Sequence, residues 1–381
     1  MSTLVTSTGA TAPATPHTAG VWAQRLPIAA AVLALFGWLL WSVSSRQALL
    51  LLVGVGLGWG LAAARFGFTT GWRTLVEKRD PSGVYGQIIL LALLAAVSMP
   101  MLAHFPETHA ALGPPSISLL VGAFVFGLCM QIADGCGSGT LYKAGLGVPL
   151  NMGILPMFAL GSFLGSVHLN GWLALGAIEP VGLVQSLGAP TALVVTLVAL
   201  AVITVGVGLW SGQHFNLARM PRRWVWGAVV LALFATLNLL IAGQPWGVVY
   251  GFGLWAAKGA TALGLFDPAA NAFWSDPGHA QRLSQTLLLD VTSITNIGIL
   301  AGALWVAPKR PQDAKPLTGQ QWLIGLAAGF ILGYSSRLAF GCNVGAMVSG
   351  ISTGSLHGWI WVPMAFLGTL IGVRVRRRFG F

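Results

Sequence analysis

The sequence contains few charged residues. Asp, Glu, Lys and Arg together make up 8% of the 381 residues, whereas a soluble domain carries roughly 25%. Hydrophobic residues make up 55%, and the mean hydropathy is +0.78. The shortage of charge excludes an ordinary soluble domain, and the long apolar runs predict an all-α polytopic membrane protein.

Acidic residues are especially scarce. The chain has 9 Asp and Glu against 20 Lys and Arg, a formal net charge of +11. The basic residues lie in short loops between apolar runs, where they set membrane orientation, so we predict no nucleic-acid partner. The same rule places both termini in the cytoplasm, and Arg46 is its one exception. The residues that carry this orientation are Arg73, Lys78, Arg79, Arg219, Arg222, Arg223, Lys309, Arg310, Lys315, Arg374, Arg376, Arg377 and Arg378.

Cysteine is also scarce. Cys129, Cys136 and Cys342 allow at most one disulfide, and we interpret them as free thiols. Their spacing relative to histidine fits no metal site. There is no phosphate-binding loop with a GK[ST] ending, and no Ser-His-Asp arrangement can be placed. We therefore predict no metal, no cofactor and no catalytic residue.

The apolar runs define the domain organisation. Residues 1–24 are rich in Ser, Thr, Ala and Pro and are predicted to be a disordered tail. Residues 25–375 are predicted to form one membrane domain of two halves, about 48–211 and 225–375, followed by a basic tail at 376–381. About 9–10 segments are predicted to cross the membrane, with 247–264 re-entrant. The candidates are 28–43, 48–64, 84–104, 116–133, 149–177, 190–211, 225–243, 247–264, 284–306, 321–337 and 358–374.

A Gly-Cys break follows one of these runs. Gly135, Gly137 and Gly139 fall within five residues around Cys136. Glycine has no Cβ and weakens a helix, so the helix is predicted to stop or restart here. Two readings of the cysteine stay open: a small buried hydrophobe, or a group that lines a path for a ligand.

The break occurs twice. At an offset of 206 residues, Gly341, Cys342 and Gly345 match Gly135, Cys136 and Gly139. Charge-based threading runs 116–133 inward and 321–337 outward, which predicts an inverted repeat whose short, broken helices meet near the midplane. The predicted substrate pathway consists of Gly135, Cys136, Gly137, Gly139, Gly341, Cys342, Asn343 and Gly345.

Charged residues inside apolar spans are accessory candidates, because such charges cost about 2.5–3.5 kcal/mol or more and usually face a cavity or a partner. For Asp134 we favour a helix cap over a proton relay. Arg65 and Arg337 either snorkel to an interface or face the pathway. Lys258 either pairs with Asp290 or serves transport. The full accessory set is Cys129, Asp134, Arg65, Thr69, Lys258 and Arg337.

Two blocks of the sequence resemble the signatures of the YeeE/YedE sulfur-transport family. They are 134–145 (DGCGSGTLYKAG) and 341–359 (GCNVGAMVSGISTGSLHGW). Weaker matches are 65–71 (RFGFTTG), 244–247 (QPWG) and 254–258 (LWAAK), and the resemblance extends over about 48–375.

The resemblance implies a multi-pass inner-membrane permease for thiosulfate or a related sulfur ion, or for selenium compounds in one branch. It also implies an inverted-repeat fold, and a small cytoplasmic sulfur-carrier protein of the TusA kind as a partner. Cys136 and Cys342 match the two central cysteines of the family. Thr69 stands where a family cysteine is often found, which alters any relay that uses a third thiol.

Two mechanisms remain open at this stage. In the first, the chain is not an enzyme, and the anion passes over neutral thiols without a covalent step. In the second, Cys136 or Cys342 carries a persulfide to a soluble acceptor, with Lys143 available to activate a thiolate.

Overall fold

The chain is almost entirely helical. The structure is a computed structural model that describes residues 18–307 and 316–381, and beyond its helices these residues form only two isolated bridges. Residues 1–17 of the predicted tail, and the basic residues Lys309, Arg310 and Lys315, lie outside the described residues. The first helix begins at Thr18, within the range predicted for the tail.

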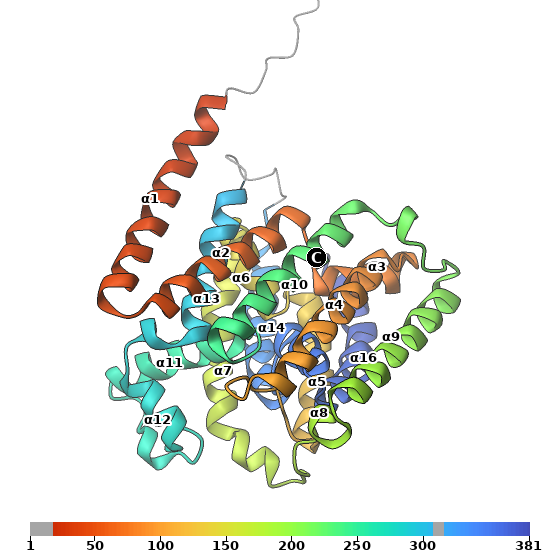
Figure 1. The fold of residues 1–381 in the computed structure, drawn as a ribbon. Helices are drawn as coiled ribbons and strands as arrows, with labels where there is room; N and C mark the ends of the chain where they lie inside the picture. Colours follow the sequence, from red (N-terminus) through yellow and green to blue (C-terminus); the bar gives the residue numbers. More distant parts are fainter. Residues whose placement is uncertain (1–17, 308–315) are drawn as a thin grey trace, which may run out of the picture.

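Helices of very different lengths follow one another along the chain (Figure 1). They are α1 (Thr18–Ser42), α2 (Ser45–Ala64), α3 (Phe68–Lys78), α4 (Ser82–His104), α5 (Ile117–Ile132), α6 (Gly137–Gly145), α7 (Pro149–Leu173), α8 (Leu183–Leu187), α9 (Ala189–Ser211), η1 (Leu217–Arg219), α10 (Arg222–Ala242), α11 (Val249–Ala262), η2 (Pro268–Ala270), α12 (Pro277–Ser284), η3 (Leu287–Leu289), α13 (Val291–Val306), α14 (Gly319–Leu338), η4 (Asn343–Ser349), α15 (Gly350–Ser352) and α16 (Leu356–Arg378).

Within the described ranges, nine helical segments are long and apolar enough to cross a membrane. Several of them are bent or broken, including 45–78, 117–145 and 319–352. Large apolar side chains remain exposed along the outer helices, as at Leu209, which is 70% exposed. Such a surface suits lipid and confirms a polytopic membrane protein.

Two predicted segments have different bounds in the structure. The run 284–306 becomes a helix only at Val291, because the Asp290 carboxylate caps α13 by accepting hydrogen bonds from the Ser293 N–H and the Ser293 and Thr292 hydroxyls, each at 2.7 Å. The predicted tail at 376–381 begins as helix, since α16 continues to Arg378. The Gln321 side chain then holds the Phe379 and Gly380 carbonyls.

Glycines bring the central helices into backbone contact. α5 packs along α16, and α7 packs along α14. A Cβ at Gly127 of α5 would lie 1.9 Å from the Ala365 carbonyl oxygen of α16, and a Cβ at Gly333 of α14 would lie 2.1 Å from the Phe158 carbonyl oxygen of α7. Small residues permit this close approach in membrane proteins, so these glycines set the spacing of the central helices.

α1 stands apart from the rest. Its N-terminal end leans away from the helical body (Figure 1), while Arg25 lies over the Trp305 ring of α13 and the later turns lie against α2 and α13. Leu39 is buried in this contact, whereas Trp41 is 94% exposed. α1 therefore adds a peripheral span and does not shape the central site.

Candidate functional site

The two Gly-Cys breaks meet inside the protein. Cys136 is the N-cap residue of α6 and Cys342 is the N-cap residue of η4, and both are fully buried. The two cysteines are neighbours in the fold, because a Cβ at Gly137, the residue after Cys136, would lie 3.1 Å from Cys342 Sγ. Two short helices that are distant in sequence thus place their N-termini against a shared pair of sulfurs.

The backbone before each cysteine turns in the same way. Asp134 and Phe340, each two residues before a cysteine, have φ values of 53° and 56°. This left-handed conformation is unusual for residues other than glycine and allows each long helix to stop and the short helix to begin. Sequence reasoning located both breaks but did not predict the conformation of these two residues.

Backbone N–H groups of the helix starts lie close to the two cysteines. The Gly139 N–H donates to Cys136 Sγ at 3.4 Å, and Ser138 Oγ lies 3.4 Å from the same sulfur. Val344 and Gly345 follow Cys342 in the first turn of η4, and neither N–H group is used to cap the Cys342 thiol. Exposed N–H groups at a helix N-terminus attract anions, so the thiol pair lies where negative charge is favoured.

The glycines of the break have distinct structural roles. A Cβ at Gly137 would lie 3.1 Å from Cys342 Sγ and 3.5 Å from the Phe158 ring, so its absence leaves room beside the thiols. Cβ atoms at Gly135 and Gly341 would meet backbone nitrogens at 2.8 and 2.6 Å, so these two permit the tight turns. A Cβ at Gly139 would lie 3.5 Å from Cys136 Sγ, an ordinary contact.

Gly345 is the least constrained of the predicted pathway glycines. A Cβ there would come no closer than 3.9 Å to the Phe340 carbonyl oxygen. Its backbone N–H lies in the first turn of η4 and is not used to cap the Cys342 thiol.

Asn343 carries unpaired polar atoms next to Cys342. Its side-chain Oδ1 and Nδ2 are both buried and have no hydrogen-bond partner in the described part of the chain. Thr140 Oγ1, one turn into α6, is also buried without a hydrogen-bond partner among the described residues. Buried polar groups are nearly always paired, so these atoms are candidates for contacts with a ligand. Thr140 was missed by sequence reasoning, although it directly follows the Gly-Ser-Gly run.

Asp134 does not cap the half-helix, as the sequence had suggested, because the cap is Cys136 itself. The Asp134 carboxylate instead forms ion pairs with Lys143 at 2.6 Å, Arg73 at 2.8 Å and Arg376 at 3.6 Å. These four residues are called the Asp134 cluster. The cluster joins α3, the α5–α6 break, α6 and α16. It contains three cations and one carboxylate.

Thr69 and Cys129 lie in the buried core close to this cluster. Thr69 is in the first turn of α3, and its carbonyl oxygen accepts from Gln131 Nε2 at 3.5 Å. Thr69 Oγ1 has no partner among the described residues. Cys129 is 3% exposed on α5. Neither is placed in contact with the thiol pair by the structure.

The other charged candidates are divided between surface and interior. Arg65 ends α2 with a φ of 48° and is exposed, which fits the interfacial reading. Lys258 donates to the Leu283 and Gln285 carbonyls instead of pairing with Asp290, whose carboxylate caps α13. Arg337 lies among aromatic rings at the end of α14.

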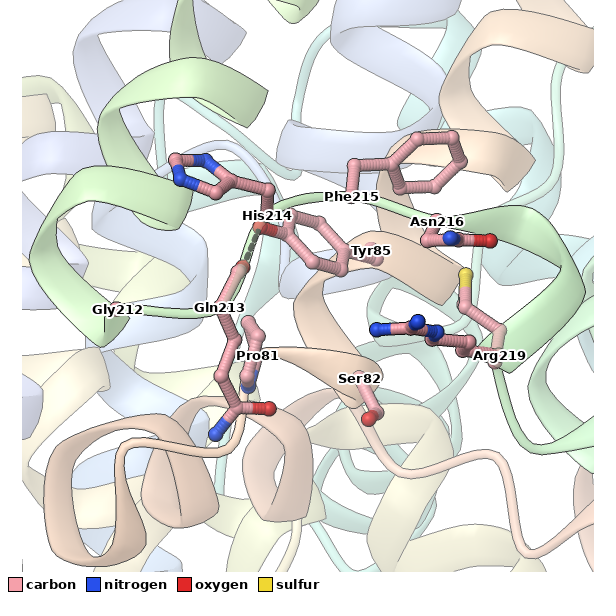
Figure 2. A pocket seen from close by; sticks show the side chains of 10 residues that line it. Pro81, Ser82, Tyr85, Gly212, Gln213, His214, Phe215, Asn216 and Arg219 are labelled. Atoms are coloured by element: carbon pink, nitrogen blue, oxygen red, sulfur yellow. Dashed lines mark hydrogen bonds between the residues drawn. The ribbon is translucent and has the colours of Figure 1, made fainter.

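A separate pocket of about 420 Å³ lies between the α3–α4 turn and the segment after α9 (Figure 2). Tyr85 Oη donates there to the Gln213 carbonyl at 2.7 Å. None of the predicted pathway residues lines it. In the part of the chain that the structure describes, no three His, Cys, Asp or Glu side chains gather as a metal site would require.

Fold and site together define a multi-pass helical membrane protein with a buried thiol pair between two half-helix N-termini. A family model described as sulphur transport matches residues 63–371. The match covers most of the chain, so the chain belongs to the sulphur-transport family, and the resemblance noted in the sequence is confirmed.

Curated relatives agree with this family. The thiosulfate transporter TsuA of Escherichia coli strain K12 is 22% identical over 86% of this chain and 95% of its own length. The TsuA of Spirochaeta thermophila is 25% identical over 86% of this chain and 98% of its own length. The probable transporter YedE of Salmonella typhimurium strain LT2 is 28% identical, over 43% of this chain and 41% of its own length.

Proposed function

We propose that this protein is an inner-membrane permease that takes up thiosulfate or a closely related sulfur anion through the Cys136–Cys342 thiol pair. The observation that carries the proposal is the meeting of the two buried thiols between half-helix N-termini. Family membership and full-length relatives named as thiosulfate transporters support the same substrate class.

The chemistry of the anion matches the site. Thiosulfate has a soft terminal sulfur, which accepts the weak S–H hydrogen bond of a thiol. Its hard oxygens accept hydrogen bonds from the N–H groups of Gly139 and Gly345 and from the unpaired amide of Asn343. Each contact is weak, so the ion is released to the next one, as conduction requires. No bond to a cysteine sulfur forms.

Helix packing supports an inverted repeat around this site. The pair α5–α16 has a counterpart in α14–α7, α2–α13 has one in α10–α4, and α7–α11 has one in α16–α3. Corresponding glycines make corresponding contacts: a Cβ at Gly161 would lie 2.0 Å from the Phe330 carbonyl oxygen, and one at Gly368 would lie 1.9 Å from that of Phe124. Two halves related in this way would form a substrate site where they meet.

The test is uptake of radiolabelled thiosulfate by proteoliposomes containing purified protein. We expect Cys136→Ala and Cys342→Ala each to reduce uptake by at least about tenfold, because each removes a thiol donor from the path. Cys129→Ala is the matched control, since this buried cysteine does not touch the pair. The proposal fails if both site variants retain normal uptake at normal protein levels. If the site variants do lose uptake, competition by sulfate, sulfite and selenium oxyanions defines the preferred substrate.

A membrane sulfurtransferase is the rival mechanism. Handing a persulfide to a soluble acceptor needs an accessible and activated thiolate. Cys136 and Cys342 are fully buried, and Lys143 is engaged by Asp134. Mass spectrometry after incubation with thiosulfate separates the two mechanisms, because only the sulfurtransferase leaves a sulfur adduct on a cysteine.

A further inference from the structure

Arg337 occupies an aromatic box at the end of α14. Its guanidinium carbon lies 5.0 Å from the centre of the Phe273 ring and 5.5 Å from that of Tyr250. Arg282 approaches the Tyr250 ring at 5.1 Å. His279 stacks on Phe273 with 4.0 Å between ring centres, and its Nδ1 lies 3.1 Å from Tyr250 Oη.

This box has cations but no bound carboxylate. Arg337 Nε is buried without a hydrogen-bond partner, and no ion pair to Arg337 or Arg282 occurs among the described residues. In the Asp134 cluster, in contrast, every cation is paired with a carboxylate. A partly buried guanidinium without an anion is costly, so the box has unused capacity for a negative ligand.

The electrostatics of His279 point the same way. Burial, Arg337 and Arg282 lower the pKa of His279 from its ordinary value of 6.5 to about 4, although Asp276 acts in the opposite direction. Burial is the largest of these causes, and the two guanidinium groups add positive potential around the ring. The same potential favours an anion.

Helix α11 connects the box to the surroundings of the thiols. Tyr250 lies on α11, and Phe252 on the same helix has its ring centre 5.3 Å from that of Phe158. Phe158 borders the space beside Gly137 and Cys342. The box is also far from the Asp134 cluster along α14. That helix begins beside the end of α16, where Gln321 holds Gly380, and the 16 residues from there to Arg337 extend about 24 Å.

We propose that Arg337, Arg282, Tyr250 and His279 form a capture site for a small oxyanion on the side of the protein away from the Asp134 cluster, before the anion reaches the thiol pair. Two guanidinium groups and a phenol hydroxyl supply donors for oxygen atoms, and guanidinium forks suit such ligands. The proposal deepens the proposed permease function and rests on it for the identity of the anion, with thiosulfate as the ligand of interest.

The first test measures uptake kinetics in proteoliposomes. Arg337→Gln and Arg282→Gln are expected to raise the KM for thiosulfate about tenfold each with little change in maximal rate, since each removes a charge-assisted hydrogen bond to the anion. Arg337→Lys should recover part of the loss, because it restores the charge but not the fork. Arg222→Gln is the control, because Arg222 is an exposed cation outside the box.

The second test measures equilibrium binding of labelled thiosulfate to the detergent-purified full chain carrying Cys136→Ala and Cys342→Ala. Binding that survives the loss of both thiols and is then lost with Arg282→Gln supports the capture site, even if the wild type transports no thiosulfate. Transport that retains its KM in a folded Arg337→Gln or Arg282→Gln protein overturns the capture site and leaves the permease intact. Arg282 is exposed, so its variant decides the question if Arg337→Gln fails to fold.

Discussion

At the scale of single residues, the missing side chain of Gly137 matters as much as the thiols. The space it leaves is bounded by Cys342 Sγ on one side and the Phe158 ring on the other. In an ordinary helix, replacing glycine by alanine is favourable by about 1 kcal/mol. At this position the added methyl group would enter the space beside the sulfurs, so function and stability are expected to separate.

Gly137→Ala is accordingly expected to fold and to lose most thiosulfate uptake, by about tenfold or more, because the Cβ would lie 3.1 Å from Cys342 Sγ. Gly206→Ala in α9 is the control, since nothing lies within 4 Å of its Cβ position. Uptake in proteoliposomes and thermal unfolding in detergent are measured for both. Normal uptake by the Gly137 variant would mean that the ion does not pass beside the thiols.

The charged candidates show how a residue's role depends on its partners. Asp134 and Arg337 both lie at helix ends near a Gly-Cys break. Asp134 forms ion pairs with three cations, whereas Arg337 packs against aromatic rings. Their places in the sequence indicated that both mattered. Neither set of partners could be read from the sequence, because the partners come from other helices.

At the scale of elements, the close packing of α5 on α16 and of α7 on α14 holds the two half-helices together. α5 leads directly into α6 through the first break, and α14 leads into η4 through the second. Any change in the spacing of these long helices would therefore also move the cysteines. The glycines that permit the close packing thus support the site from a distance.

Gly127→Ala is expected to destabilise the protein by about 1–3 kcal/mol, because its Cβ would lie 1.9 Å from the Ala365 carbonyl oxygen and the backbones would have to separate. Gly368→Ala should behave alike, since its Cβ would meet the Phe124 carbonyl oxygen at the same distance. Thermal unfolding in detergent measures the loss, with Gly206→Ala as reference. Equal stability of all three variants would contradict backbone contact between α5 and α16.

At the scale of the whole molecule, orientation follows from the distribution of charge. The Asp134 cluster and the arginines at the end of α16 lie together, whereas α12 belongs to the part of the chain that covers Arg337. The positive-inside rule assigns the first group to the cytoplasm. The capture site would then face the outside, where an uptake system meets its substrate.

Cysteine labelling measures this orientation in a chain whose three native cysteines are replaced by alanine. Gln281→Cys in α12 is expected to react with a membrane-impermeant maleimide in intact cells. Arg378→Cys at the end of α16 is expected to react only after the membrane is opened, and both positions are exposed in the structure. The reverse pattern would invert the molecule and make the Arg337 box an exit rather than a capture site.

Most of the spans could be predicted from composition, because long apolar runs need no partner to identify them. The ends of the helices were less predictable where a capping side chain sets them. Asp290 is an example, because it caps α13 so that this helix begins at Val291. Lys258 illustrates the same limit, since its carbonyl partners lie at the end of the short helix α12, which no sequence pattern links to Lys258.

By itself, the sequence determined that this is a polytopic membrane protein of the sulphur-transport family with two Gly-Cys breaks, because hydropathy and glycine spacing act locally along the chain. Only the tertiary structure decided that Cys136 and Cys342 lie next to one another, that Asp134 binds cations from three helices, and that Arg337 has no anionic partner among the described residues. These facts depend on contacts between segments up to about 240 residues apart, and such contacts form only when the glycine-rich helix faces pack together.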